Sequence, residues 1–167
     1  MKLKTQIVVI ALALGVSTSL VSSQDRQPRQ LRTVTPTIVG VWQVTRQAVN
    51  CNDPNQQLGP SFPALVTFHS DGTVHGDSVG PGGTAAEGTA EHGVWQRELG
   101  SQNYSFREVS YGWDPDTGAF EGSAVFTETL HLTSANSFEG SATIQIFDAD
   151  GNLVFTACAT RTGTRFE

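Results

Sequence analysis

The chain has 167 residues, of which 38% are hydrophobic, and a formal net charge of −6 at pH 7. Its charges are spread without long runs, which excludes the clustered basic face that nucleic-acid binding requires. The length suits a single domain, and beyond the first part of the chain no segment is apolar enough to cross a membrane.

The first 23 residues are typical of a secretory signal peptide. Lys2 and Lys4 form a short positive region, and the apolar run 7–14 is too short to span a bilayer. Small residues at 21–23 match what a signal peptidase recognises, so cleavage is expected after Ser23. No cysteine lies nearby, which disfavours a lipoprotein anchor, and an uncleaved N-terminal anchor stays the alternative. We therefore expect a secreted or periplasmic protein with no membrane association after cleavage.

Residues 24–37 are expected to form a disordered arm, because they are polar and carry two prolines. The domain is expected to span residues 38–167. Alternating polar and apolar residues separated by turn residues predict about eight strands and no helix. These strands are expected at 39–48, 64–69, 73–76, 93–99, 104–111, 120–132, 138–147 and 153–160. Such spacing favours an all-β, antiparallel up-and-down barrel, or a sandwich, and an eight-stranded barrel just holds one small ligand.

Three intervening segments are expected to be loops or turns. Residues 51–63 carry Asn, Asp, Gly and three prolines. Residues 79–88 are rich in glycine and predict a mobile loop, with a lid over a pocket mouth as its functional alternative. Residues 148–152 have the oxygen density of a calcium loop but are too short for one, so a turn explains them.

Side chains alternate between the two faces of a strand, and two polar residues interrupt the expected inward face. Arg46 follows Trp42 and Val44, and Glu128 lies between Phe126 and Leu130. A buried carboxylate must be paired, protonated or hydrated. Either Arg46 or Arg97 is a possible partner for Glu128, and hydration near a barrel mouth is the alternative.

The functional interpretation makes Glu128 and an arginine the few orienting groups of an apolar pocket. Glu108 is a weaker candidate of the same kind.

The two cysteines, Cys51 and Cys158, are expected to form a disulfide in an oxidising compartment, with two buried free thiols as the alternative. A bridge closing a loop of roughly a hundred residues is worth about 4–5 kcal/mol in the chain-entropy model.

The histidines do not converge on a metal site. His69 and His75 would share one face of a hairpin, but Phe68 and Val74 then take the core face and leave both histidines solvated. No catalytic residue, metal ligand or cofactor is predicted from a motif.

The opening Gly40-Val41-Trp42, an arginine in the final strand (Arg161 or Arg165) and the hairpin at 71–76 resemble the lipocalin and avidin group of small barrels, the calycins. The Thr-Asp-Tyr motif of lipocalins is missing. This resemblance implies a barrel in which the arginine packs on Trp42, and a general role in binding apolar small molecules.

The disulfide selects between the two arginines. If Trp42 lay opposite Arg161, Cys51 would fall about six residues, roughly 20 Å, from Cys158, too far for a bridge. With Trp42 opposite Arg165 the gap closes. We therefore expect Gly40, Trp42 and Arg165 to close the barrel.

The leading hypothesis is a lipocalin-like barrel, monomeric or weakly oligomeric, that binds a small apolar or amphipathic molecule. Trp42 would close its floor, Arg46 and Glu128 would orient the ligand, and the wall would be lined by Phe68, Trp95, Phe106 and Phe126. The alternatives are an enzyme related to allene oxide cyclases and dirigent proteins, with Glu128 as its buried carboxylate, and a protein-binding module of the protease-inhibitor type. Binding without catalysis is favoured.

Overall fold

A computed structural model describes residues 37–78 and 88–166 of the chain. The expected signal peptide, nearly all of the expected arm and residues 79–87 of the expected lid lie outside these ranges. Within them, no helix is long and apolar enough to cross a membrane. The strands are β1 (Gly40–Asn50), β2 (Asp53–Gln57), β3 (Phe62–Phe68), β4 (Thr73–Ser78), β5 (Glu91–Arg97), β6 (Asn103–Trp113), β7 (Phe120–Ser134), β8 (Ser137–Phe147) and β9 (Leu153–Arg165).

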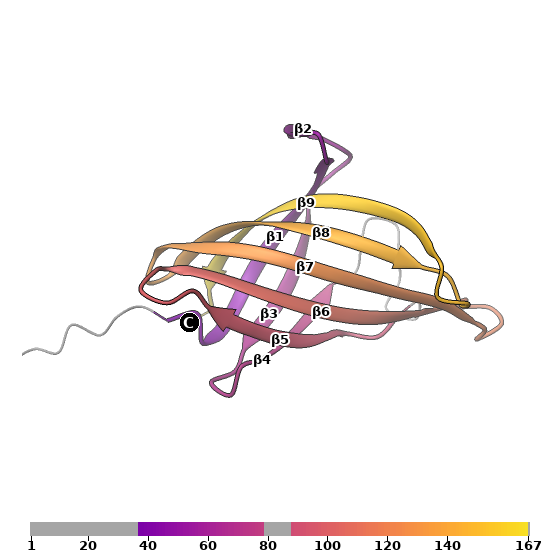
Figure 1. The fold of residues 1–167 in the computed structure, drawn as a ribbon, viewed down its shortest axis with the longest axis horizontal. Coiled ribbons are helices and arrows are strands. Elements are labelled where there is room, and N and C mark those ends of the chain that lie inside the picture. Colours follow the sequence, from indigo (N-terminus) through magenta and orange to yellow (C-terminus); the bar gives the residue numbers. More distant parts are fainter. Residues whose placement is uncertain (1–36, 79–87, 167) are drawn as a thin grey trace, which may run out of the picture. The chain divides into compact units, whose positions relative to one another are not determined.

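Eight of these strands form a closed antiparallel barrel (Figure 1). Pairing runs from β1 to β3 and then in sequence order to β9, which returns to pair with β1. The expected all-β up-and-down barrel is therefore confirmed. Neighbouring strands of the barrel are antiparallel and follow one another along the chain, so the topology contains no crossover.

The ninth strand, β2, corrects the expectation that residues 51–63 form only a loop. It pairs with the end of β1 through Val49↔Gln57 and Asn50↔Asp53, and it stands away from the barrel wall in Figure 1. All five of its residues are exposed. Because the strand has no buried face, its sequence carries no apolar alternation that could reveal it.

One end of the barrel interior, the floor half, is a packed apolar core. Along β1, Trp42 and Val44 are buried whereas Val41, Gln43 and Thr45 are exposed, as alternation requires. The other core residues are Ile38, Ala64, Val66, Phe68, Val74, Tyr104, Phe106, Leu130, Leu132 and Phe138.

The floor is closed by Trp42 and Arg165. These residues lie opposite each other on β1 and β9, which confirms the register that the disulfide selected. The Arg165 guanidinium lies 4.3 Å from the centre of the Trp42 ring. It also donates hydrogen bonds to the carbonyl oxygens of Thr37 and Val39 (2.7 and 2.8 Å). This arginine thus ties the last strand to the segment that precedes the first.

Gly40 is required by the same contact. Its φ is +138°, and a Cβ there would collide with Nη1 of Arg165. Glycine supplies both the backbone conformation and the space.

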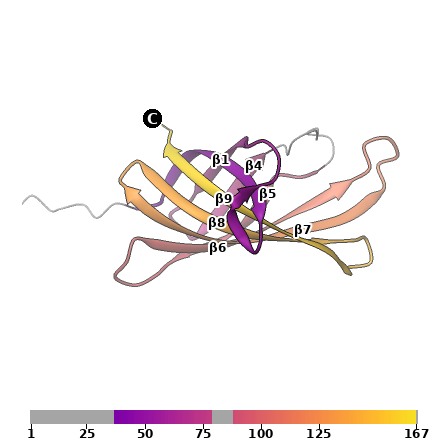
Figure 2. The same cartoon turned by 90° about the horizontal axis from the view of Figure 1, so that it is seen from above.

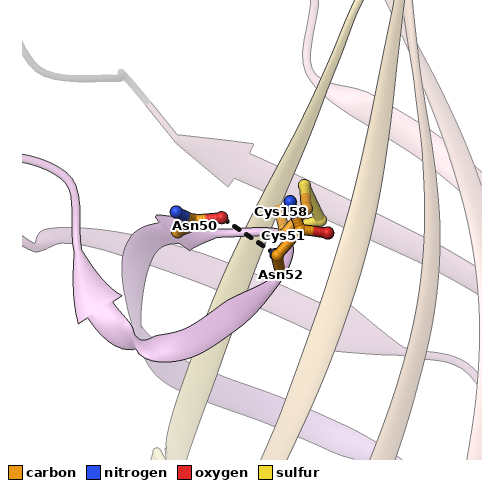
Figure 3. The surroundings of a disulfide bond; sticks show 4 residues. All are labelled: Asn50, Cys51, Asn52 and Cys158. Carbon is orange, nitrogen blue, oxygen red and sulfur yellow. Dashed lines mark hydrogen bonds between the residues drawn. A yellow bond between two sulfur atoms is a disulfide. The ribbon is translucent and has the colours of Figure 1, made fainter.

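The disulfide Cys51–Cys158 lies where β1 ends, with Cα atoms 5.1 Å apart (Figure 3). In the adjoining turn, the Asn52 amide donates to Oδ1 of Asn50 at 2.9 Å. The bridge was expected from the sequence and joins residues separated by 107 positions. A loop of that size gives about 4.7 kcal/mol of stabilisation in the chain-entropy model.

The opposite end of the barrel, the open half, is built mainly from β6 to β9. Residues 153–157 of β9 continue past the part that pairs with β1, because that pairing begins at Cys158. Figure 2 shows the β6–β7 and β8–β9 hairpins extending away from the shorter strands. The inner face of these extensions is consequently less covered than the floor.

Candidate functional site

Five charged side chains from five strands meet inside the barrel; we call them the charged layer. They are Arg46 (β1), Glu91 (β5), Glu108 (β6), Glu128 (β7) and Arg161 (β9), and each is at most 5% exposed. Charged residues of these types are almost never fully buried unless they are paired. The charged layer is therefore the part of the interior that packing alone does not explain.

The first pair in the charged layer joins Arg46 and Glu91. Two guanidinium nitrogens of Arg46 each donate to one oxygen of Glu91 at 2.5 Å. Arg46 also donates to the Ser78 hydroxyl at 2.7 Å, and that hydroxyl donates to Glu91 at 3.2 Å. Burial alone would raise the pKa of Glu91, but the hydrogen bonds and charge of Arg46 outweigh it and hold the pKa below its ordinary value. This pair is ionised and bidentate, although Nε of Arg46 has no hydrogen-bond partner among the described residues.

The second pair joins Arg161 and Glu128 across β8. Nη2 of Arg161 lies 2.5 Å from Oε1 of Glu128, although no nitrogen of Arg161 forms an aligned hydrogen bond to a described residue. The intervening β8 residues are Gly140 and Ala142, opposite Arg161 and Glu128 respectively, and these small residues leave room for the two side chains to meet. Burial raises the pKa of Glu128 to about 8, although the charge of Arg161 opposes the shift.

Among the residues that the structure describes, no cation forms an ion pair with Glu108. It is 1% exposed, and neither carboxylate oxygen accepts a hydrogen bond from the described residues. Burial, followed by repulsion from Glu91, raises the pKa of Glu108 to about 7, although both arginines oppose the shift. At neutral pH this carboxyl is consequently poised between its charged and neutral forms.

Gly76 on β4 makes room for two of these carboxylates. A Cβ at this position would lie 3.2 Å from Oε1 of Glu108 and would collide with Oε2 of Glu91. Glu91 and Glu108 therefore approach each other over a residue that has no side chain. When every group is ionised, each arginine has its own carboxylate and the charged layer keeps one surplus negative charge, at Glu108.

Three of the residues expected to line a pocket wall pack in the floor half instead. The Phe68 ring lies 5.2 Å from that of Phe106 and 6.3 Å from that of Trp95, both edge-on. Phe68 and Phe106 are at most 5% exposed. These aromatic residues form the apolar support on which the charged layer rests.

Phe126, the fourth expected wall residue, lies on the other side of the charged layer. The guanidinium of Arg46 lies 5.9 Å from the centre of its ring. Strand pairing aligns Phe126 with Ile144 on β8 and Ala157 on β9. A second inward row, formed by Ala124, Ile146 and Phe155, lies next to it on the same three strands. All six residues of these two rows are partly or largely exposed: Ala124, Phe126, Ile144, Ile146, Phe155 and Ala157. We call this set the open apolar wall.

The charged layer thus separates two different surroundings. Below it is a packed floor closed by Trp42, and above it is the open apolar wall. Of these two sides, that of the open apolar wall is the more exposed. An apolar surface with a few convergent polar groups is the usual composition of a small-molecule site.

Sequence reasoning placed Arg46, Glu128 and Glu108 on the inward face, where the structure has them. Its suggested partners for Glu128 are wrong. Arg46 pairs with Glu91, and Arg97 is exposed and donates its Nε–H to the carbonyl of Ser101 at 2.8 Å. Hydration of Glu128 at a mouth is also wrong, since it is 1% exposed.

Two members of the charged layer were missed. Glu91 lies on the same face of β5 as Gly93 and Trp95. If the predicted strand had begun two residues earlier, alternation would have placed Glu91 on the inward face. Arg161 shares the inward face of β9 with Ala159 and was weighed only as a possible closing residue. Alternation could have placed both inside the barrel.

The histidines lie outside the barrel. His69 and His75 are exposed, and His75 stacks on His92 with ring centres 4.6 Å apart. Among residues 37–78 and 88–166, no group of three His, Cys, Asp or Glu side chains is placed to hold a metal ion.

Two large hollows lie on the outer surface. One of about 630 Å³ crosses β5 to β8 and the other, of about 640 Å³, crosses β9, β1, β3 and β4. Their linings include outward residues such as Ser105, Thr129 and Thr162. Neither lining includes a member of the charged layer, and a third hollow, of about 330 Å³ over β5 to β7, includes only Glu128. Because the five charged side chains converge inside the barrel, we place the candidate site there.

Comparison with known proteins leaves the family open. No protein-family model and no curated protein matches the sequence. Among solved structures, the chain is similar to an S-type phycobiliprotein lyase (CPES) from Guillardia theta, with a TM-score of 0.38 and 12% sequence identity. The match covers 78% of this chain and 89% of the lyase. A likeness at this level carries no argument about function.

Proposed function

We propose that this protein is a binding protein for a small amphipathic molecule. The ligand's apolar part lies against the open apolar wall, and its polar head contacts the charged layer. The observation that carries the proposal is the position of Glu108, a buried carboxylate with no hydrogen-bond partner among the described residues, directly inside a half-exposed apolar surface. Burying a carboxylate without hydrogen-bond partners destabilises the folded state, and the packing of neighbouring apolar groups does not offset this free energy.

Each part of the site has a distinct role in this proposal. Phe126 and Ile144 contact the apolar part of the ligand, while the Arg46–Glu91 and Arg161–Glu128 pairs hold the charged layer in place. The floor aromatics and Trp42 prevent the ligand from passing deeper into the barrel. The carboxylate oxygens of both Glu108 and Glu128 lack hydrogen-bond partners among the described residues, but Glu128 has Arg161 within ion-pair distance, so Glu108 is the carboxylate left for the ligand's head.

A fluorescent apolar probe tests the proposal. N-phenyl-1-naphthylamine, which is neutral at neutral pH, should increase its emission on binding the wild-type protein. Ile144→Asn places an amide on the open apolar wall and should weaken binding strongly. The matched control is Thr143→Asn, because Thr143 is the preceding residue of β8 and lies exposed on the outer face. Equal binding by both variants, or no binding by the wild type, overturns the proposal.

The proposal includes two further elements from the sequence. Export to an oxidising compartment, the secreted or periplasmic space, is supported by the Cys51–Cys158 disulfide. Kinship with the calycins is supported by the packing of Arg165 on Trp42 behind Gly40.

A second candidate function is catalysis inside the same barrel. It is favoured by two buried carboxyls, Glu108 and Glu128, whose pKa values are raised to about 7 and about 8. Groups that titrate near neutral pH suit proton transfer. Small molecules released from protein purified from its own host would be incubated with fresh protein and followed by mass spectrometry. Conversion that Glu128→Gln abolishes favours an enzyme, and an unchanged molecule favours a binding protein.

A further inference from the structure

The negative charge that the charged layer carries in excess when all five groups are ionised indicates which polar head the ligand carries. Arg46 is neutralised by Glu91 and Arg161 by Glu128, with nitrogen–oxygen distances of 2.5 Å in both pairs. Glu108 has no such partner, and both of its oxygens are buried and unbonded among the described residues. A buried charge requires a counter-charge or hydrogen bonds.

Building on the proposed function, we propose that the ligand is a monocationic amine whose ammonium group pairs with Glu108. An ammonium supplies N–H donors and one positive charge, which together satisfy the carboxylate and neutralise the charged layer. The alkyl or aryl part of the amine then lies along the open apolar wall, beside Phe126.

An anionic head fits the charged layer less well. Arg161 has nitrogens without aligned hydrogen bonds, so it is the group that an anion would approach. When Glu128 is ionised, its charge balances that of Arg161, and an anion would then add a second unbalanced negative charge to the buried layer. A neutral hydroxyl would donate one hydrogen bond but would leave the surplus charge in place.

The surroundings of Glu108 determine how binding depends on pH. Glu91 faces it from β5, Arg46 from β1, Arg161 from β9 and Glu128 from β7. Their combined effect places half-ionisation of Glu108 near neutral pH. An alkylammonium stays charged up to about pH 10, as a lysine side chain does. Ammonium binding should therefore strengthen by about tenfold from pH 6 to pH 8 as Glu108 loses its proton.

The test compares three molecules that share one chain and differ in the head: n-octylammonium, octan-1-ol and octanoate. Each is titrated calorimetrically into the wild-type protein, Glu108→Gln and Glu139→Gln. Glu139 is exposed on β8, so its replacement removes the same charge from the outer surface and serves as the matched control. At pH 8 we expect octylammonium to bind the wild type and Glu139→Gln about tenfold more tightly than octan-1-ol, the usual gain from a hydrogen bond to a charged group. Glu108→Gln should lose that advantage and keep its affinity for octan-1-ol.

The outcomes separate this inference from the function on which it rests. Tightest binding of octanoate, equal binding of all three molecules, or an ammonium preference that survives in Glu108→Gln would overturn the amine assignment while leaving an amphipathic-ligand site. Binding of none of the three would overturn both. If Glu108→Gln does not fold, the wild-type pH series decides, since a flat octylammonium affinity between pH 6 and pH 8 contradicts the role of Glu108.

Discussion

Replacing Glu108 by Gln should stabilise the protein at alkaline pH and change its stability much less at acidic pH. Burial raises the pKa of this carboxyl from its ordinary 4.5 to about 7. A raised carboxyl pKa means that the folded state binds the proton more tightly than the unfolded chain. The contribution of Glu108 to stability is thus complete below about pH 4.5 and is lost as the pH rises through about 7.

The magnitude follows from the size of the shift. Each pKa unit corresponds to about 1.4 kcal/mol, so the fully ionised Glu108 lowers the free energy of unfolding by about 3 kcal/mol relative to its neutral form. Glutamine has nearly the same shape and is never ionised. The variant should consequently gain up to about 3 kcal/mol over the wild type at pH 9, and about a quarter of that at pH 5.

Urea denaturation at pH 5 and pH 9, with the disulfide oxidised, measures this difference directly. Glu139→Gln serves again as the exposed control and should shift the free energy of unfolding only slightly at either pH. Glu128 stays in both proteins, so its own titration largely cancels in the comparison. A gain of equal size at the two pH values, or a loss at pH 9, would refute the assignment of Glu108 as the unpaired carboxylate.

Three further predictions concern the same framework. Glu91→Gln breaks the buried bidentate ion pair with Arg46 and should lower the free energy of unfolding by about 3–5 kcal/mol at pH 7. Because the pKa of Glu91 is lowered in the folded state, urea titrations should show a smaller loss of stability as the pH falls below 4.5. Gly76→Ala should cost about 1–3 kcal/mol in thermal melts, since the new Cβ meets Glu91 and Glu108. Reduction of Cys51–Cys158 should lower the free energy of unfolding by about 2–5 kcal/mol, and an unchanged melting temperature would contradict that estimate.

The sequence was most informative where one face of a strand is buried. The alternation around Trp42 and Phe126 located the strands and placed Arg46 and Glu128 inside, because side chains reverse direction at every residue. The two cysteines added a distance constraint, which selected Arg165 as the partner of Trp42.

The pairing of charges could not be predicted in the same way. Alternation shows which face a residue occupies but not how high in the barrel its side chain lies, and the meeting of Glu128 with Arg161 depends on the small β8 residues between them. Glu91 was missed because Gly93 weakens the start of its strand in the sequence pattern. β2 was missed because none of its residues is buried.

Nuclear magnetic resonance of isoleucine methyl groups tests the central claim most directly. The described part of the chain has Ile144 and Ile146 on the open apolar wall and Ile38, which is 0% exposed, in the floor. Octylammonium and octan-1-ol would be titrated into protein labelled at these methyls. Saturable shifts at Ile144 and Ile146, with Ile38 nearly unchanged, are the predicted result. Unmoved Ile144 and Ile146 signals at ligand saturation would contradict binding inside the barrel.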